Sequence, residues 1–273
     1  MPSVNSISID KLARLIGTAA CPTIVDVRTD EDFDAEPFLV PGSVRRSHKD
    51  VAAWADAYAG HSVVVVCQQG LKLSHGVAAW LRHAGAATAE SLDGGTEGWG
   101  RADQPRVIAD KLPPRDGLGR TVWVTRERPK IDRIACPWLI QRFVDPAAVF
   151  LYVKASEVAG VASRFDATPF DVEDVFWSHR GELCSFDVMV EELGLSSPGL
   201  SHLARIVRAA DTDRLDLEPP AAGLLAASLG LSRNFVDDLE QLDAGMVLYD
   251  AFYRWCRDAT DETHNWPTNR PGA

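Results

Sequence analysis

The chain has 273 residues, of which 46% are hydrophobic and 25% are charged, which suits a globular protein with room for two modest domains. Its net charge is −11: residues 1–107 carry 10 basic and 13 acidic side chains, and the remaining residues carry 18 and 26. Neither part has the basic face that a phosphate backbone attracts, so we expect no direct binding of nucleic acid.

Cysteine usage and the N-terminus predict where the protein works. The five cysteines form no C-x-x-C pair, which favours reduced thiols in a cytoplasm over a disulfide framework. The first residues lack the basic region and apolar core of a secretory signal, and no apolar run approaches the roughly 18 residues of a membrane span. We therefore expect a cytoplasmic protein without a membrane partner.

The first part of the chain alternates short strands and helices, which predicts an α/β domain with a parallel sheet over residues 1–107. Its central stretch is Val63 to Val66, four β-branched residues that predict a strand buried on both faces. Cys67 follows at the carboxyl end of this strand, and residues 68–74 lead into a helix. Ligands of parallel sheets bind at such ends, and a helix start favours a thiolate there.

Three further segments accompany the Cys67 loop: residues 22–28, residues 40–43 and residues 92–99. In this order and spacing the four segments resemble a single rhodanese domain over about residues 6–107. The resemblance implies that the Cys67 thiolate takes a sulfane sulfur from a small anionic donor such as thiosulfate and passes the persulfide to a thiol acceptor. No cofactor is required for this transfer.

The expected cradle for the anionic donor is the set of N–H groups from Gln68, Gln69, Gly70, Leu71, Lys72, Leu73 and Ser74. Asp26 and Arg28 are supporting candidates that bind each other or orient neighbouring turns.

The loop also departs from the rhodanese pattern. Relatives place a basic residue fifth and a serine sixth after the cysteine, whereas here Lys72 is fifth, Leu73 sixth and Ser74 seventh. The loop thus looks one residue longer and resembles phosphatase and arsenate reductase relatives, although it lacks their arginine. An oxyanion reductase of the chromate or arsenate type, or an inactive scaffold, therefore remains open.

Residues 108–120 concentrate proline, glycine and charge, which predicts a linker. Residues 121–273 predict a second, α+β domain that is mostly helical. It begins with a strand over residues 121–125, a helix that starts at Pro137 because proline suits a first turn, and a strand over residues 148–153.

The second domain resembles the C-terminal chromate resistance domain of ChrB-type proteins over about residues 121–257. The resemblance is carried by residues 131–139, 178–187, 206–212 and 245–250. Regulators of that family pair this domain with a DNA-binding region, which a rhodanese-like domain replaces here, so transcriptional regulation is not expected to carry over.

Two clusters of the second domain could hold chemistry. His179, Glu182, Cys184 and Asp187, with the remote Asp211, could bind zinc or iron; the alternative is a capped turn with a buried cysteine. The other cluster has Asp132, Arg133 and Arg142 around Cys136. It could bind an oxyanion such as chromate beside a reducing thiol, or it could be a buried ion-pair network.

These patterns favour a sulfurtransferase linked to chromate resistance. The alternative is an oxyanion or metal binding or sensing protein on an inactive rhodanese scaffold. The sulfur donor, the sulfur acceptor, the metal and the oligomeric state are not fixed by the sequence.

Overall fold

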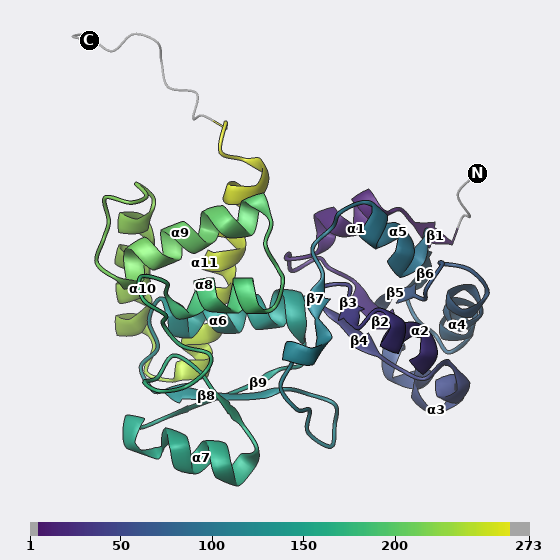
Figure 1. The fold of residues 1–273 in the computed structure, drawn as a ribbon, viewed down its shortest axis with the longest axis horizontal. Coiled ribbons are helices and arrows are strands. Elements are labelled where there is room, and N and C mark those ends of the chain that lie inside the picture. The colour runs from purple at the N-terminus through teal and green to yellow at the C-terminus, as the bar shows by residue number, and fades with distance from the viewer. Residues whose placement is uncertain (1–4, 263–273) are drawn as a thin grey trace.

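The computed structural model describes residues 5–262, which form two domains that lie side by side (Figure 1). The first domain is built on a parallel sheet in the order β1-β6-β5-β2-β4, with β5 (Ser62–Val66) in the centre. The other strands are β1 (Ser6–Ile7), β2 (Thr23–Asp26), β4 (Ser43–Arg45) and β6 (Thr88–Leu92). The helices are α1 (Ile9–Leu15), α2 (Asp30–Ala35), α3 (Val51–Trp54), α4 (Lys72–His83) and α5 (Gly95–Arg101), with 3₁₀ turns at His48–Asp50 and Ala55–Tyr58.

Strand β5 is buried on both faces, as its sequence predicts. Val64 and Val66 belong to one hydrophobic cluster, which also includes Leu12 of α1 and Trp99 of α5. The alternate valines of the strand belong to a second cluster with side chains of α4. Successive side chains of a strand point to opposite faces, so a run of valines joins both cores. The parallel α/β sheet expected for this domain is confirmed.

The second domain carries a three-stranded parallel sheet in the order β10-β8-β9 and is otherwise mostly helical, which confirms the expected class. Its strands are β8 (Val122–Arg126), β9 (Val149–Val153) and β10 (Thr168–Pro169). Its helices are α6 (Asp132–Leu139), α7 (Val158–Phe165), α8 (Ser185–Glu192), α9 (Pro198–Asp211), α10 (Ala221–Asn234) and α11 (Asp238–Asp258). A π-helical turn at Ile140–Val144 continues α6, and a 3₁₀ turn at Ala155–Glu157 precedes α7. Among the described residues, no helix is both long and apolar enough to span a bilayer.

Helix α6 corrects one expectation. It begins at Asp132 and not at Pro137, so the proline lies inside the helix. A proline inside a helix has no N–H to donate to the carbonyl four residues earlier, here that of Arg133. The hydroxyl of Tyr152 donates to this carbonyl instead, at 2.8 Å. The sequence could not show this partner, because Tyr152 lies on β9.

The start of the predicted linker is ordered. β7 (Val107–Ile108) pairs antiparallel with β3 (Phe38–Leu39), and a 3₁₀ turn follows at Ala109–Lys111. The amide of Ile108 also donates to the carbonyl of Leu193, at the end of α8. This segment therefore contacts both domains.

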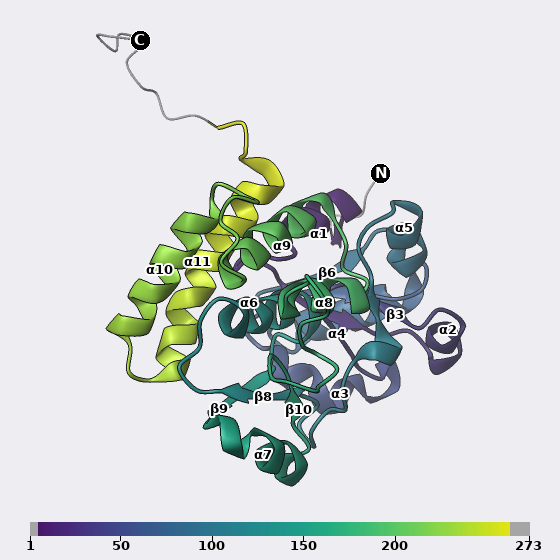
Figure 2. The ribbon, with the colours of Figure 1, turned by 60° about the vertical axis from the view of Figure 1, so that its left-hand side comes forward.

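The two domains share one hydrophobic core. The cluster that includes Leu12 and Trp99 of the first domain continues into Phe143 and Tyr253 of the second. The amide of Gly42 donates to the carbonyl of Phe143 at 2.6 Å across the boundary. The guanidinium of Arg257 in α11, which lies beside α10 in Figure 2, donates to the carbonyl of Ile16, the residue after α1, at 3.3 Å. The relative position of the domains is thus fixed by apolar packing as well as by hydrogen bonds.

Candidate functional site

Cys67 lies directly after β5, at the carboxyl end of the central strand. Only 4% of its surface is exposed. Its Sγ donates to Oγ of Ser74 at 3.3 Å, and the Ser74 hydroxyl donates to the carbonyl of Leu71 at 3.0 Å. The hydroxyl could turn and donate to a thiolate instead. Ser74 is therefore the polar neighbour of the sulfur.

Helix α4 starts at Lys72, so Ser74 lies in the first turn of this helix. Leu73, which occupies the position where relatives carry serine, packs against the apolar cluster beneath Cys67. The serine one position later takes over the contact with the sulfur. The altered order of the two residues thus preserves a hydroxyl next to the thiol.

The loop after Cys67 is hydrogen-bonded to the start of α5. The carbonyls of Cys67 and Gln68 accept hydrogen bonds from the amides of Thr96 and Glu97, each at 3.0 Å. Gly70 has φ +69°, and a Cβ built on it would lie 2.3 Å from the carbonyl oxygen of Leu92. Only glycine fits this approach.

The amides of residues 68–74 have no acceptor in the part of the chain that the structure describes. They are the N–H groups of a tight loop and of the first turn of a helix of 12 residues, where unpaired donors and a partial positive charge are expected. Lys72, the first residue of that helix, is exposed and adds a full positive charge. Gln68 instead accepts at its Oε1 from Thr96 Oγ1, and Gln69 is exposed.

Asp26 and Arg28 bind each other. Arg28 Nε lies 2.9 Å from Asp26 Oδ2, and the guanidinium also donates to the carbonyls of Glu36 and Phe38. Both side chains are buried. The pair ties the end of β2 to the segment before β3, so its role is structural.

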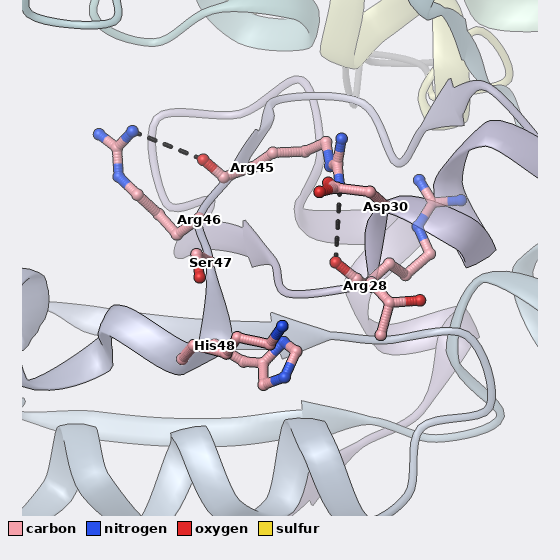
Figure 3. A pocket seen from close by; sticks show the side chains of 8 residues that line it. Arg28, Asp30, Arg45, Arg46, Ser47 and His48 are labelled. Carbon is pink, nitrogen blue, oxygen red and sulfur yellow. Dashed lines mark hydrogen bonds and ion pairs between the residues drawn. The ribbon is translucent and has the colours of Figure 1, made fainter.

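A basic cleft of about 290 Å³ lies at the same edge of the sheet as Cys67, and the sequence analysis did not single it out. Figure 3 shows Arg45, Arg46 and His48 around it. Arg45 is paired with Asp30 at 2.8 Å, whereas Arg46 and Lys49 form no ion pair within residues 5–262. The cleft follows β4, which is two strands from β5 in the sheet order, so the axes of these two strands are about 10 Å apart. The signal that could have indicated it is the pair of arginines at the end of a strand.

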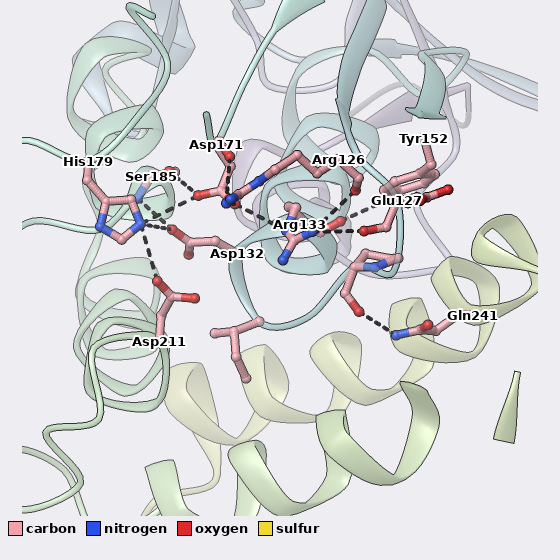
Figure 4. A network of polar contacts seen from close by, with 12 residues as sticks. Arg126, Glu127, Asp132, Arg133, Tyr152, Asp171, His179, Ser185, Asp211 and Gln241 are labelled. Carbon is pink, nitrogen blue, oxygen red and sulfur yellow. Dashed lines mark hydrogen bonds and ion pairs between the residues drawn. The ribbon is translucent and has the colours of Figure 1, made fainter. Parts of the chain in front are cut away.

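A polar cluster in the second domain joins residues from both candidate sets (Figure 4). His179 Nε2 lies 3.2 Å from Asp211 Oδ2, 3.4 Å from Asp132 Oδ2 and 3.4 Å from Asp171 Oδ1. Asp132 begins α6, Asp211 ends α9, and His179 lies in the segment before α8. Three distant segments thus meet at one imidazole.

Burial and neighbouring charges shift the pKa values of Asp132 and His179 in this cluster. Burial is the main cause that raises the pKa of Asp132 to about 7; its hydrogen bond with His179 lowers the pKa, and the charges of Asp211 and Asp171 raise it. The pKa of His179 is raised to about 12, first by its hydrogen bond with Asp132 and then by those with Asp171 and Asp211. Without another cation, these carboxylates hold the imidazole in its charged form.

The other candidates of the second domain lie outside this cluster. Glu182 is 81% exposed at its side chain and pairs with Arg214, so it faces away. Asp187 accepts from the amide of Cys184 at 3.1 Å, and both residues form the start of α8. The carboxylate of Asp187 therefore caps a helix, and the sulfur of Cys184 is buried. This arrangement is the alternative to a metal site, a capped turn with a buried cysteine.

The residues predicted to lie together around Cys136 have different partners in the structure. Arg142 forms a double hydrogen bond with Asp250, far along the chain in α11, at 2.8 Å for each contact. Cys136 is fully buried, and burial raises the pKa of its thiol well above the usual value. Arg133 instead pairs with Asp171 at 3.3 Å, so only Asp132 and Arg133 of this group lie at the cluster.

Asp171 is the cluster residue that the sequence analysis missed. It follows β10 and accepts at Oδ1 from the hydroxyl of Ser185 at 2.8 Å. Its position at the carboxyl end of a parallel strand was the available signal, but two-residue β10 is too short to recognise in a sequence.

Comparison with protein families matches both domains. A model of the rhodanese-like domain matches residues 8–102, and a model of the ChrB C-terminal domain matches residues 123–256. Protein ChrB of Cupriavidus metallidurans is 32% identical over 154 residues, which cover 55% of this chain and 46% of that protein. The chain thus matches less than half of the length of this relative.

Solved structures also resemble part of the chain. A rhodanese-like domain protein from Staphylococcus aureus is 25% identical with a TM-score of 0.32, and the match covers 35% of this chain and 91% of that one. A rhodanese-related protein from Thermoplasma volcanium is 19% identical with a TM-score of 0.33, over 38% of this chain and 98% of that one.

Proposed function

The chain joins a rhodanese-like domain to a ChrB C-terminal domain, and from this premise we propose that it is a sulfurtransferase with a Cys67 persulfide intermediate, working in chromate resistance. The observation that carries the proposal is the set of amides at residues 68–74 that have no acceptor among the described residues and that directly follow Cys67 at the end of β5. Unpaired N–H groups at a helix start bind anions without further arrangement.

The proposed reaction has two steps. The Cys67 thiolate attacks the outer sulfur of thiosulfate, an S–S bond forms to Cys67, and the S–S bond of the donor breaks to release sulfite with its electron pair. A thiol acceptor or cyanide then takes the outer sulfur and returns Cys67 to the thiolate. No external oxidant or reductant is needed, because the donor brings a sulfur atom at the right oxidation level.

Three features of the loop support this chemistry. The amides can hold the anionic group of the donor, Lys72 adds positive charge, and the Ser74 hydroxyl can donate to the thiolate in place of the Leu71 carbonyl. The partial positive charge at the start of α4 favours negative charge on the sulfur and on the donor.

The positive charge of the basic cleft also supports the proposal. Arg46 and Lys49 follow β4, which is two strands from β5 in the sheet order. Their positive field attracts an anion to this edge of the sheet in a chain whose net charge is −11.

The test is cyanide-dependent formation of thiocyanate from thiosulfate or mercaptopyruvate by the full chain, with Cys67→Ser and Cys21→Ser as matched variants. Cys21 is a partly exposed thiol of the same domain that lies outside the loop. We expect activity in the wild type and in Cys21→Ser and only background in Cys67→Ser. Intact and peptide mass spectra after thiosulfate should show one added sulfur atom on Cys67.

An equal background rate for wild type and Cys67→Ser with both donors, together with no sulfur adduct, would overturn the proposal. Cys67 would then belong to a scaffold, in keeping with its low exposure.

A further inference from the structure

The polar cluster of the second domain gathers two carboxylates and one imidazole that are fit to bind a cation. The ligand atoms of Asp132, His179 and Asp211 all lie within 4.8 Å of one another. They come from α6, from the segment before α8 and from α9, so the fold brings them together over long sequence distances. Figure 4 shows the carboxylates of Asp132 and Asp211 facing the same side of the imidazole.

One carboxylate oxygen of this cluster lacks a partner. Asp132 is fully buried; its Oδ2 accepts from the amide of Ser185 at 2.6 Å, but its Oδ1 is buried with no hydrogen bond in the described structure. A buried carboxylate oxygen without a donor is costly, because it has lost its water without a replacement. A cation bound by the Asp132 carboxylate could supply the partner that this oxygen lacks.

The distances suit ligands of one ion better than hydrogen bonds. His179 Nε2 lies 3.2–3.4 Å from three carboxylates, although one N–H can donate well to only one acceptor, at about 2.9–3.0 Å. Four atoms that lie about 2.0–2.1 Å from a tetrahedral ion are about 3.3 Å from each other. The spacing between His179 and the two aspartates therefore matches the edge of such a ligand shell.

The charge of the cluster also matches a divalent ion. Asp171 is paired with Arg133 at 3.3 Å and with Arg126 at 3.6 Å, so its charge is compensated. Within residues 5–262, Asp132 and Asp211 pair with no lysine or arginine. With a neutral imidazole, two negative charges remain at the site.

We propose that Asp132, His179 and Asp211 bind a divalent transition-metal ion of the zinc, manganese and iron(II) class. Asp171 is a supporting residue: it accepts from Ser185, whose amide holds Asp132, and it lies next to the imidazole. Such outer partners fix the orientation of ligands. Carboxylate and imidazole donors suit these ions and disfavour copper(I).

Three protein ligands leave at least one coordination position open. The His179 side chain is 41% exposed, so the cluster is accessible from solvent. The site requires neither Cys67 nor the rhodanese-like sheet, and it therefore goes beyond sulfur transfer.

The experiment uses the full chain, stripped with EDTA and then titrated separately with Zn²⁺, Mn²⁺ and anaerobic Fe²⁺. Binding is measured by equilibrium dialysis with elemental analysis, and stability by the melting temperature. We expect one ion per chain for at least one metal, and a rise in melting temperature that follows its binding curve. His179→Ala and Asp211→Asn, both at accessible side chains, should bind at least tenfold more weakly, and Asp171→Asn about 10–100-fold more weakly.

Glu182→Gln is the matched control, because Glu182 lies in the same segment as His179 but pairs with Arg214. It should bind metal like the wild type. No binding and no melting shift with any of the three ions would overturn the proposal, as would equal binding by His179→Ala, Asp211→Asn and the wild type. In that case the cluster is an ion-pair network around a charged imidazole.

Discussion

The buried pair of Asp26 and Arg28 shows how a single residue can fix the neighbourhood of a site. The Arg28 side chain has no exposed surface, and its guanidinium satisfies both oxygens of Asp26 as well as two backbone carbonyls. It also lies over the rings of Phe33 and Phe38. Because each of the three guanidinium nitrogens has a partner, the charge is tolerated at the end of β2.

Replacement of Arg28 by methionine should lower the free energy of unfolding by about 3–5 kcal/mol, because Asp26 would stay buried without its partner. Urea unfolding of the two proteins measures the difference. The double variant Asp26→Leu, Arg28→Met should recover at least half of the loss, since it removes the unpaired charge. A loss below about 1 kcal/mol in the single variant would contradict this account.

The type of a residue was enough to predict some members of the two candidate sites, but not all of them. His179 and Asp211 were selected because histidine and aspartate are common ligands, and Cys67 because it ends a buried strand. Asp171 was missed, and Glu182 and Asp187 were grouped with the wrong partners, because closeness in sequence does not give the direction of a side chain. The partner of Asp132 depends on where α6, α8 and α9 meet, and no local pattern contains that information.

At the scale of elements, the unit of β5, its loop and α4 was predictable because its signals are local. Four valines, a glycine and an apolar helical run give the strand, turn and helix directly. The start of α6 was not predictable, because the hydroxyl that compensates for Pro137 comes from Tyr152 on another strand. Local patterns thus fail where a distant element satisfies the backbone.

The Cys67 loop should tolerate no side chain at its glycine. A Cβ on Gly70 would meet the Leu92 carbonyl and the Gly95 amide at 2.3 and 2.7 Å, and its φ of +69° adds about 1–2 kcal/mol of strain. We expect Gly70→Ala to lose more than about 3 kcal/mol of unfolding free energy and most of the sulfur transfer.

The control for this loop variant lies in the helix that follows. Gly76 is inside α4, and a Cβ there would meet nothing within 4 Å. Gly76→Ala should therefore stabilise the protein by up to about 1 kcal/mol and leave sulfur transfer unchanged. Equal effects of the two alanines on stability and transfer would show that the close approach at Gly70 is unimportant.

At the scale of the whole molecule, two domains that the sequence separates by a linker share a single core. The composition of residues 108–120 predicts a change between domains, but it cannot reveal that β7 pairs with β3. Nor can it show that Phe143 and Tyr253 pack on the first domain. We therefore expect the chain to unfold as one cooperative unit, with rhodanese-like and helical parts melting together.

Gly17 and Gly60 offer a matched test of this shared core. Both have φ +77°, so alanine strains the backbone equally, by about 1–2 kcal/mol. A Cβ on Gly60 would meet nothing within 4 Å, whereas one on Gly17 would lie 2.4 Å from Cζ of Phe143 and 2.5 Å from Cε1 of Tyr253.

Both aromatic rings are buried at the domain boundary, and both must shift to admit a Cβ on Gly17. Gly17→Ala should therefore lose about 1–3 kcal/mol more than Gly60→Ala in urea unfolding, because the extra methyl group overpacks the boundary. Calorimetry should also show a single transition for Gly60→Ala and a broadened or divided one for Gly17→Ala. Equal losses with a single transition in both variants would mean that the boundary yields without cost, and that the domains are held together elsewhere.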